Sequence, residues 1–162
     1  MEKKESAGLA IVYEGKVLLG HTTNRGWTSS YGIPKGGIDE GESKREAAIR
    51  ETQEELGISV PTSLIQPKEH KFIVTARKYK YTKIVYYYVV EISDLSQIGL
   101  KDLRVPKNQL QMEEIDWAGF LDYKEAMKKI MKSQVPVINH LASQGLLESS
   151  ILDYHSFCNL SS

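Results

Sequence analysis

One acidic segment constrains this chain more than any other. Residues 36–58 read GGIDEGESKREAAIRETQEELGI, and Glu51, Glu54 and Glu55 fall within five positions. On an α-helix these positions lie three and four residues apart, so the three carboxylates share one face. Like charges at i and i+4, such as Glu51 and Glu55, weaken a helix by about 0.2–0.5 kcal/mol. Because Mg²⁺ is held in proteins by a few carboxylates together with substrate phosphates, the segment predicts a metal site.

Local signals place these glutamates on a helix between two loops. Ser43 followed by Glu46 forms a capping box, S-x-x-E, which marks a helix start. Gly57 is a natural terminator. A stripe at i, i+4 and i+8 that can face a core is formed by Ala48, Thr52 and Leu56. Arg50 lies four residues from Glu46 and from Glu54, so its guanidinium can offset carboxylate repulsion.

Length and composition indicate a single globular domain. The 162 residues are 41% hydrophobic and 26% charged, with a formal net charge of zero. This balance disfavours a sequence-independent DNA binder, which is usually basic. The single cysteine, Cys158, excludes an internal disulfide, and no apolar run reaches the length of a membrane span. We therefore expect a cytoplasmic protein with one domain over residues 1–148 and a tail of unknown role over 149–162, and the oligomeric state stays open.

The remaining pattern predicts strands flanked by helices. The expected strands are Ala10–Tyr13 and Lys16–Gly20 as a hairpin, a short strand at Ile33 ended by Pro34, the pair Lys71–Ala76 and Lys83–Ile92, and Ile115–Phe120. We expect a helix over Asp122–Met131, an interruption at Pro136, and a second helix over Val137–Leu147. This order favours an α/β fold with a mixed β-sheet packed between helices.

The acidic segment resembles the Nudix box, written G-x5-E-x7-R-E-U-x-E-E-x-G-U with U a bulky apolar residue. The matching residues are Gly36, Glu42, Arg50, Glu51, Thr52, Glu54, Glu55, Gly57 and Ile58. The resemblance implies a Nudix-type α/β/α sandwich that hydrolyses a nucleoside diphosphate linked to another moiety with Mg²⁺ or Mn²⁺. It also implies metal binding by Glu51, Glu54, Glu55 and the carbonyl of Gly36.

The same resemblance assigns roles within the box. One glutamate orients or deprotonates the attacking water, and we favour Glu54, although families in this group differ. Arg50 holds Glu51 or Glu54 in place, and Glu42 is structural. A further carboxylate from outside the box often completes such sites, and Glu113 and Glu114 are candidates. The alternative for these two is an exposed loop charge.

The run Pro34-Lys35-Gly36 and the box core RETQEE resemble the asymmetrical diadenosine tetraphosphate hydrolases, which release AMP and ATP. Lys35 and Lys83 are point charges suited to a polyphosphate, and Tyr87 is the predicted base contact. Where that subgroup has a histidine, this chain has Gly37. His21 could approach from the preceding loop, but we favour the alternative of a surface histidine at a strand end.

Three other functions stay open at this stage. The 5′ end of triphosphorylated RNA is a second candidate substrate, which a basic patch of Lys78, Lys80 and Lys83 would suit. ADP-ribose or another nucleotide sugar is a third. A catalytically silent nucleotide-binding module is disfavoured, because all three metal carboxylates are present.

Overall fold

The computed structural model describes residues 2–76 and 81–148. The predicted C-terminal tail, Cys158, Lys78 and Lys80 lie outside the described residues. Among the described residues, no helix is both long enough and apolar enough to cross a membrane.

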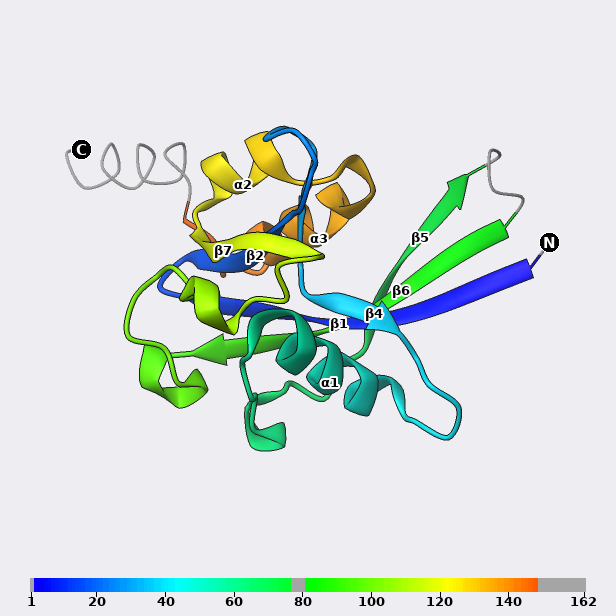
Figure 1. Cartoon of the computed structure of the whole chain (residues 1–162), viewed down its shortest axis with the longest axis horizontal. Coiled ribbons are helices and arrows are strands. Elements are labelled where there is room, and N and C mark those ends of the chain that lie inside the picture. The colour runs from blue at the N-terminus through cyan, green and yellow to red at the C-terminus, as the bar shows by residue number, and fades with distance from the viewer. Residues whose placement is uncertain (1, 77–80, 149–162) are drawn as a thin grey trace.

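A mixed sheet forms the centre of the molecule (Figure 1). Its seven strands in the described chain are β1 (Glu2–Tyr13), β2 (Lys16–Thr22), β3 (Tyr31–Gly32), β4 (Lys35–Gly37), β5 (His70–Ala76), β6 (Tyr81–Ile92) and β7 (Ile115–Leu121). The main order is β3-β2-β1-β6-β5, with β4 paired to β1 and β7 paired to β2. Strand β1 runs parallel to β6 from Glu2↔Tyr81 to Tyr13↔Ile92 and antiparallel to β2 and β4.

Helices cover both faces of this sheet. Helix α1 (Lys44–Leu56) packs on one face, while α2 (Tyr123–Lys129) and α3 (Val135–Ser143) pack on the other (Figure 1). Strand β6 shows why two cores form, because alternate side chains of a strand point to opposite faces. Val89 is buried on the α2/α3 side and Val90 on the α1 side. The predicted α/β/α sandwich with a mixed sheet is therefore confirmed.

The two predicted ends of α1 are confirmed, and the Ser43 half of the predicted capping box is formed. Ser43 is the N-cap, and its hydroxyl accepts from the backbone N–H of Glu46 at 3.1 Å. Gly57 ends the helix in the left-handed conformation at φ 64°, and its N–H donates to the carbonyl of Gln53 at 2.9 Å. Thr52 is buried, and its hydroxyl donates to the carbonyl of Ala48 at 2.8 Å. This bond explains how a threonine occupies an apolar position of the box.

The predictions for the start of β1, for Ile33 and for Pro136 were wrong, and α3 ends at Ser143, four residues before the predicted Leu147. Strand β1 begins at Glu2, eight residues earlier than expected, because pairing with β6 compensates for its polar sequence. Ile33 lies between β3 and β4, and its N–H donates to the side chain of Gln134. Pro136 lies in the first turn of α3, where a missing N–H costs nothing, so it starts the helix that it was expected to precede.

Candidate active site

Strand β4 brings the start of the acidic segment against the sheet. Its residues pair with β1 in the register Ser6↔Gly37, Ala7↔Gly36 and Gly8↔Lys35. A Cβ at Gly8 would come within 2.7 Å of the Cβ of Lys35 and would also overlap the carbonyl oxygen of Pro34. The absence of a side chain at Gly8 therefore allows β4 to approach, and it fixes the backbone of Lys35 and Gly36.

Helix α1 then places two carboxylates against β4. The Glu51 carboxylate lies so close to Gly36 that a Cβ at this position would overlap it. One turn along, Glu55 Oε1 accepts from the backbone N–H of Lys35 at 3.1 Å. Glu55 is only 5% exposed, and burial raises its pKa to about 8, while burial also raises the pKa of Glu51.

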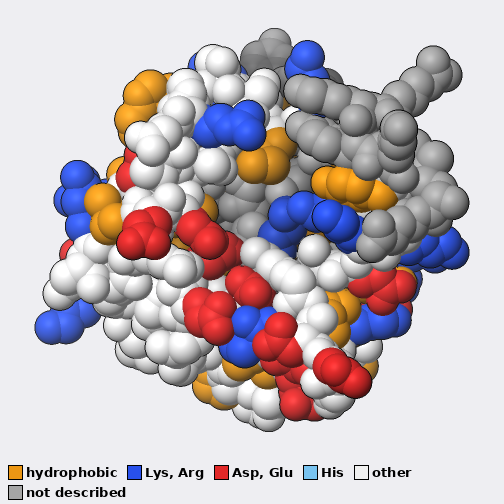
Figure 2. Space-filling model, turned by 45° about the vertical axis from the view of Figure 1, so that its right-hand side comes forward, with side chains coloured by type: hydrophobic (Ala, Val, Ile, Leu, Met, Phe, Trp, Pro, Cys, Tyr) orange, Lys and Arg blue, Asp and Glu red, His pale blue; other side chains and the backbone are white. Residues whose placement is uncertain are grey.

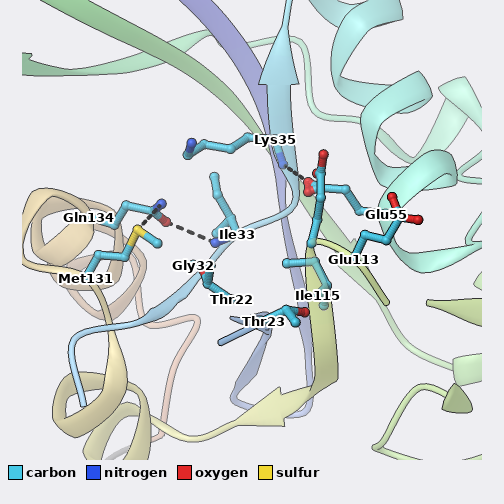
Figure 3. A pocket seen from close by; sticks show the side chains of 12 residues that line it. Thr22, Thr23, Gly32, Ile33, Lys35, Glu55, Glu113, Ile115, Met131 and Gln134 are labelled. Carbon is cyan, nitrogen blue, oxygen red and sulfur yellow. Dashed lines mark hydrogen bonds between the residues drawn. The ribbon is translucent and has the colours of Figure 1, made fainter. Parts of the chain in front are cut away.

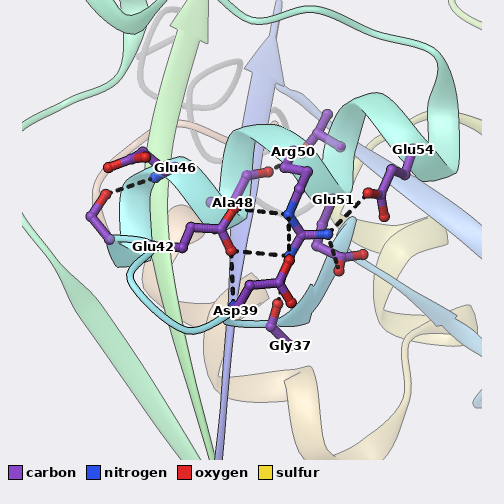
Figure 4. A network of polar contacts seen from close by, with 10 residues as sticks. Gly37, Asp39, Glu42, Glu46, Ala48, Arg50, Glu51 and Glu54 are labelled. Atoms are coloured by element: carbon purple, nitrogen blue, oxygen red, sulfur yellow. Dashed lines mark hydrogen bonds and ion pairs between the residues drawn. The ribbon is translucent and has the colours of Figure 1, made fainter.

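Arg50 connects the helix to the loop that precedes it (Figure 4). Its Nε donates to Glu42 Oε2 at 2.8 Å, and its second terminal nitrogen donates to the carbonyl of Gly37 at 2.8 Å. Its first terminal nitrogen contacts Glu51 Oε1 at 3.1 Å and Glu54 Oε1 at 3.0 Å. The hydrogen bond with Arg50 lowers the pKa of Glu42. Arg50 therefore positions both the loop and two of the predicted metal ligands.

The donor set suits a hard divalent cation. Glu51, Glu54, Glu55 and the Gly36 carbonyl offer only oxygen atoms, which Mg²⁺ and Mn²⁺ prefer. Because Gly36 has no Cβ, its backbone can lie directly beside the Glu51 carboxylate. Over residues 2–76 and 81–148 no three acidic, histidine or cysteine side chains converge as a ready-made metal cluster, since Arg50 draws Glu51 and Glu54 toward itself. Figure 2 shows the resulting band of acidic side chains on this face, with basic side chains within and beside it.

A cleft of about 350 Å³ opens beside Glu55 (Figure 3). Lys35, Glu55, Glu113 and Glu114 line it together, so both candidate extra carboxylates lie at the predicted site. Both are exposed, and the charge of Glu114 contributes to the raised pKa values of Glu51 and Glu55. Glu114 is thus the better placed of the two to complete the site.

The two predicted phosphate contacts lie together. Burial, followed by the neighbouring Lys83 ammonium, lowers the pKa of Lys35 to about 8. Lys83 is half-buried on β6, the strand next to β1. Two ammonium groups held side by side repel one another, and a bound polyanion would relieve that repulsion.

The structure does not bring Tyr87 into the cleft. Tyr87 is 4% exposed in the core on the α2/α3 side, where it stacks against His70 with ring centroids 5.1 Å apart. Its proposed base contact stays a prediction. His21 is also buried, and its two ring nitrogens contact Asp116 and the carbonyl of Gly26.

Sequence reasoning did not identify Gln134, which lines the cleft. It is fully buried, and its Oε1 accepts from the N–H of Ile33 at 2.9 Å (Figure 3). A glutamine between Ser133 and Val135 gives no periodic or motif signal. Its contact spans 101 positions of sequence, so only the fold reveals it.

This arrangement of box residues can be compared with known proteins. A family model described as NUDIX domain matches residues 3–141. The chain belongs to the Nudix family. Members of this family generally use divalent metal ions, in agreement with the oxygen-only donor set described above.

Relatives agree with this assignment. A protein named RNA pyrophosphohydrolase from Sulfurovum sp. (strain NBC37-1) is 30% identical over 129 residues, which cover 74% of this chain and 78% of that protein. A Caenorhabditis elegans Ap4A hydrolase binary complex has a TM-score of 0.63 at 21% identity, covering 88% of this chain and 97% of that one. A MutT NUDIX hydrolase from Burkholderia pseudomallei has a TM-score of 0.67 at 16% identity, covering 86% and 98%. This chain is therefore a Nudix hydrolase of pyrophosphate bonds.

Adjacent glycines provide a matched test of the metal site. Gly36→Ala should abolish the increase in melting temperature caused by Mg²⁺ or Mn²⁺, because its Cβ would displace the Glu51 carboxylate. Gly37→Ala should keep that increase, because a Cβ there meets no atom within 4 Å. Differential scanning fluorimetry with and without metal measures both variants. Equal metal responses in the two variants would contradict the assigned role of Gly36.

The buried Glu55 predicts a pH dependence of stability in metal-free buffer. Its folded pKa of about 8 lies above the ordinary value of 4.5, so its stabilising contribution is complete below about pH 4.5 and is lost as pH rises toward 8. Glu55→Gln keeps an acceptor for the Lys35 N–H but removes this titration. Urea unfolding in EDTA should show the variant gaining stability relative to wild type between pH 5 and pH 8. A stability difference that does not change with pH would show that Glu55 is not buried as described.

Proposed function

We propose that this chain hydrolyses a pyrophosphate linkage in a nucleoside polyphosphate with Mg²⁺, and that diadenosine tetraphosphate, cut to AMP and ATP, is its leading substrate. The observation that carries the proposal is the position of Lys35, whose backbone N–H donates to the buried Glu55 carboxylate while its ammonium interacts with that of Lys83. A chain of phosphates requires cations along its length and a metal at the bond that breaks. The likeness of Pro34-Lys35-Gly36 to the asymmetrical hydrolases supports the choice of substrate.

The box residues divide the chemistry among them. When bound, a divalent cation neutralises phosphate charge and lowers the pKa of a coordinated water. Glu51, Glu54, Glu55 and the Gly36 carbonyl would hold it. Glu54 is half exposed, so its carboxylate can reach solvent water and accept a proton. Arg50 contacts Glu51 and Glu54 and is a positioning residue, while Glu114 can supply a further carboxylate.

A 5′-triphosphorylated RNA is the second candidate substrate. The named activity of the Sulfurovum relative favours it, and the Lys35–Lys83 pair suits a triphosphate equally well. The basic segment that includes Lys78 and Lys80 also supports an RNA substrate, on the evidence of the sequence alone. Both candidates present a polyphosphate attached to a nucleoside, so the cleft would have to neutralise phosphate charge in either case.

A substrate panel tests the proposed function directly. Diadenosine tetraphosphate, triphosphorylated RNA, ADP-ribose and nucleoside triphosphates are incubated with Mg²⁺ or Mn²⁺, and the products are identified by chromatography. We expect AMP and ATP from diadenosine tetraphosphate, and Glu54→Gln should lower kcat by about 10²–10⁴-fold, the range for a lost general base. An unchanged fold by circular dichroism with near-normal kcat would remove Glu54 from its role. No turnover of any polyphosphate would overturn the proposal.

Lys35 should matter most for long phosphate chains. Lys35→Ala should raise KM for diadenosine tetraphosphate roughly tenfold, the scale of a lost charge-assisted hydrogen bond, and should change KM for ADP-ribose less. Steady-state kinetics on both substrates measures the difference. Lys101→Ala, an exposed lysine on the connector between β6 and β7, is the control. If Lys35→Ala affected the two substrates equally, Lys35 would not be a polyphosphate contact.

A further inference from the structure

The indole of Trp27 is the most exposed large hydrophobic side chain in the described part of the chain, at 60%. It lies on the loop between β2 and β3, residues 23–30. Its ring stacks on His21 with centroids 4.0 Å apart and an angle of 15° between the planes. Single exposed hydrophobic residues are ordinary. The stacking partner behind this one is not, because His21 is only 1% exposed.

The position of His21 is fixed on both sides. Its Nδ1 pairs with the carboxylate of Asp116, and its Nε2 lies 3.0 Å from the carbonyl oxygen of Gly26. Tyr31 packs beside it with ring centroids 5.0 Å apart. A ring held by two polar contacts and an aromatic neighbour cannot turn freely. The indole therefore rests on a fixed ring, with one face on His21 and the other toward solvent.

The loop that carries Trp27 is attached to the rim of the catalytic cleft. Thr22 and Thr23 line the cleft. The Thr23 N–H donates to the carbonyl of Glu114 at 2.9 Å, and the Thr23 hydroxyl donates to the carbonyl of Met112 at 2.8 Å. At the end of β2, the Thr22 N–H donates to the carbonyl of Ser30 at 3.1 Å, and this hydrogen bond closes the loop. The loop that carries the exposed indole is thus held to the rim of the cleft, while Trp27 itself lies outside the cleft lining.

We propose that the solvent-facing side of Trp27 stacks a nucleobase of the substrate that lies outside the cleft. This inference rests on the proposed function, because both candidate substrates carry more than one base. In a dinucleoside tetraphosphate it is the base of the distal nucleoside, and in RNA it is the base of a following nucleotide. Base–aromatic stacking tolerates every base, since each presents a π-face. Trp27 therefore selects for the presence of a second base and not for its identity.

Kinetics on paired substrates tests the inference. Diadenosine tetraphosphate is compared with adenosine 5′-tetraphosphate, which has the same phosphates and one base. Trp27→Ala should raise KM for the two-base substrate about tenfold, within the range for one lost stacking contact, and should leave its kcat and the one-base KM nearly unchanged. Trp27→Phe keeps a ring and should recover most of the loss. Leu103→Ala, which removes another exposed apolar side chain (41%), is the matched control.

The same comparison with a 5′-triphosphorylated dinucleotide and a nucleoside triphosphate identifies the source of the base. A selective effect in either pair of substrates supports the inference and names the source. An equal rise in KM for one-base and two-base substrates would indicate a structural role for Trp27 and would overturn the inference. So would normal KM values for every substrate in Trp27→Ala.

Fluorescence provides a readout that does not need turnover. The chain has two tryptophans, Trp27 and the half-buried Trp117. Titration of metal-free protein with diadenosine tetraphosphate should quench wild-type emission and should have little effect in Trp27→Phe. Quenching that persists in Trp27→Phe would overturn the inference. Selective quenching without hydrolysis of any substrate would support the inference and contradict the proposed function. Normal hydrolysis without Trp27-dependent quenching would support the proposed function and contradict the inference.

Discussion

The contact between strand β4 and helix α1 is the constraint on which the site depends. Gly36 leaves no room for a side chain beside Glu51, and the N–H of Lys35 binds Glu55 one helical turn away. These two contacts fix the helix against the strand and, in doing so, bury carboxylates that would otherwise be solvated. Burying a carboxylate is unfavourable without compensation. Burial accordingly raises the pKa of Glu55. A divalent cation bound to these oxygens would offset the unfavourable burial.

Arg50 resolves the repulsion that such clustering creates. Its guanidinium lies among Glu42, Glu51 and Glu54 and also binds the carbonyl of Gly37. Hydrogen bonds with Glu42 and Glu54 raise the pKa of Arg50 further above its ordinary value, so its charge is permanent. The same contacts turn two carboxylates away from a common centre. If Glu51 and Glu54 hold the proposed cation, each would exchange part of its contact with Arg50 for contact with the metal, so Arg50 would compete with the cation as well as position its ligands.

The sequence predicted what depends on neighbouring residues and missed what depends on distant ones. Helix α1 was predicted closely, because Ser43 and Gly57 cap it through contacts within four residues. The layers of the fold followed from periodicity in strands such as β6. The full length of β1 did not, because Glu2 joins the sheet through a partner 79 positions away. Gln134 was missed for the same reason, since its side-chain oxygen accepts from Ile33, 101 positions away.

Although the formal net charge is zero, acidic and basic side chains form separate groups near the site. The carboxylates of α1 form one side of the site, and the Lys35–Lys83 pair lies close to them. A polyanionic substrate could not approach the carboxylates unaided, because like charges repel across this short range. Under the proposed function, the lysines would offer it a first contact, and a cation held by the carboxylates would offer the second. Composition sums these opposed groups to nothing, whereas the fold brings Lys35 and Glu55 to one cleft. Under the proposed function, this pairing of acidic and basic groups, more than either set alone, would let a neutral protein bind both a cation and a phosphate chain.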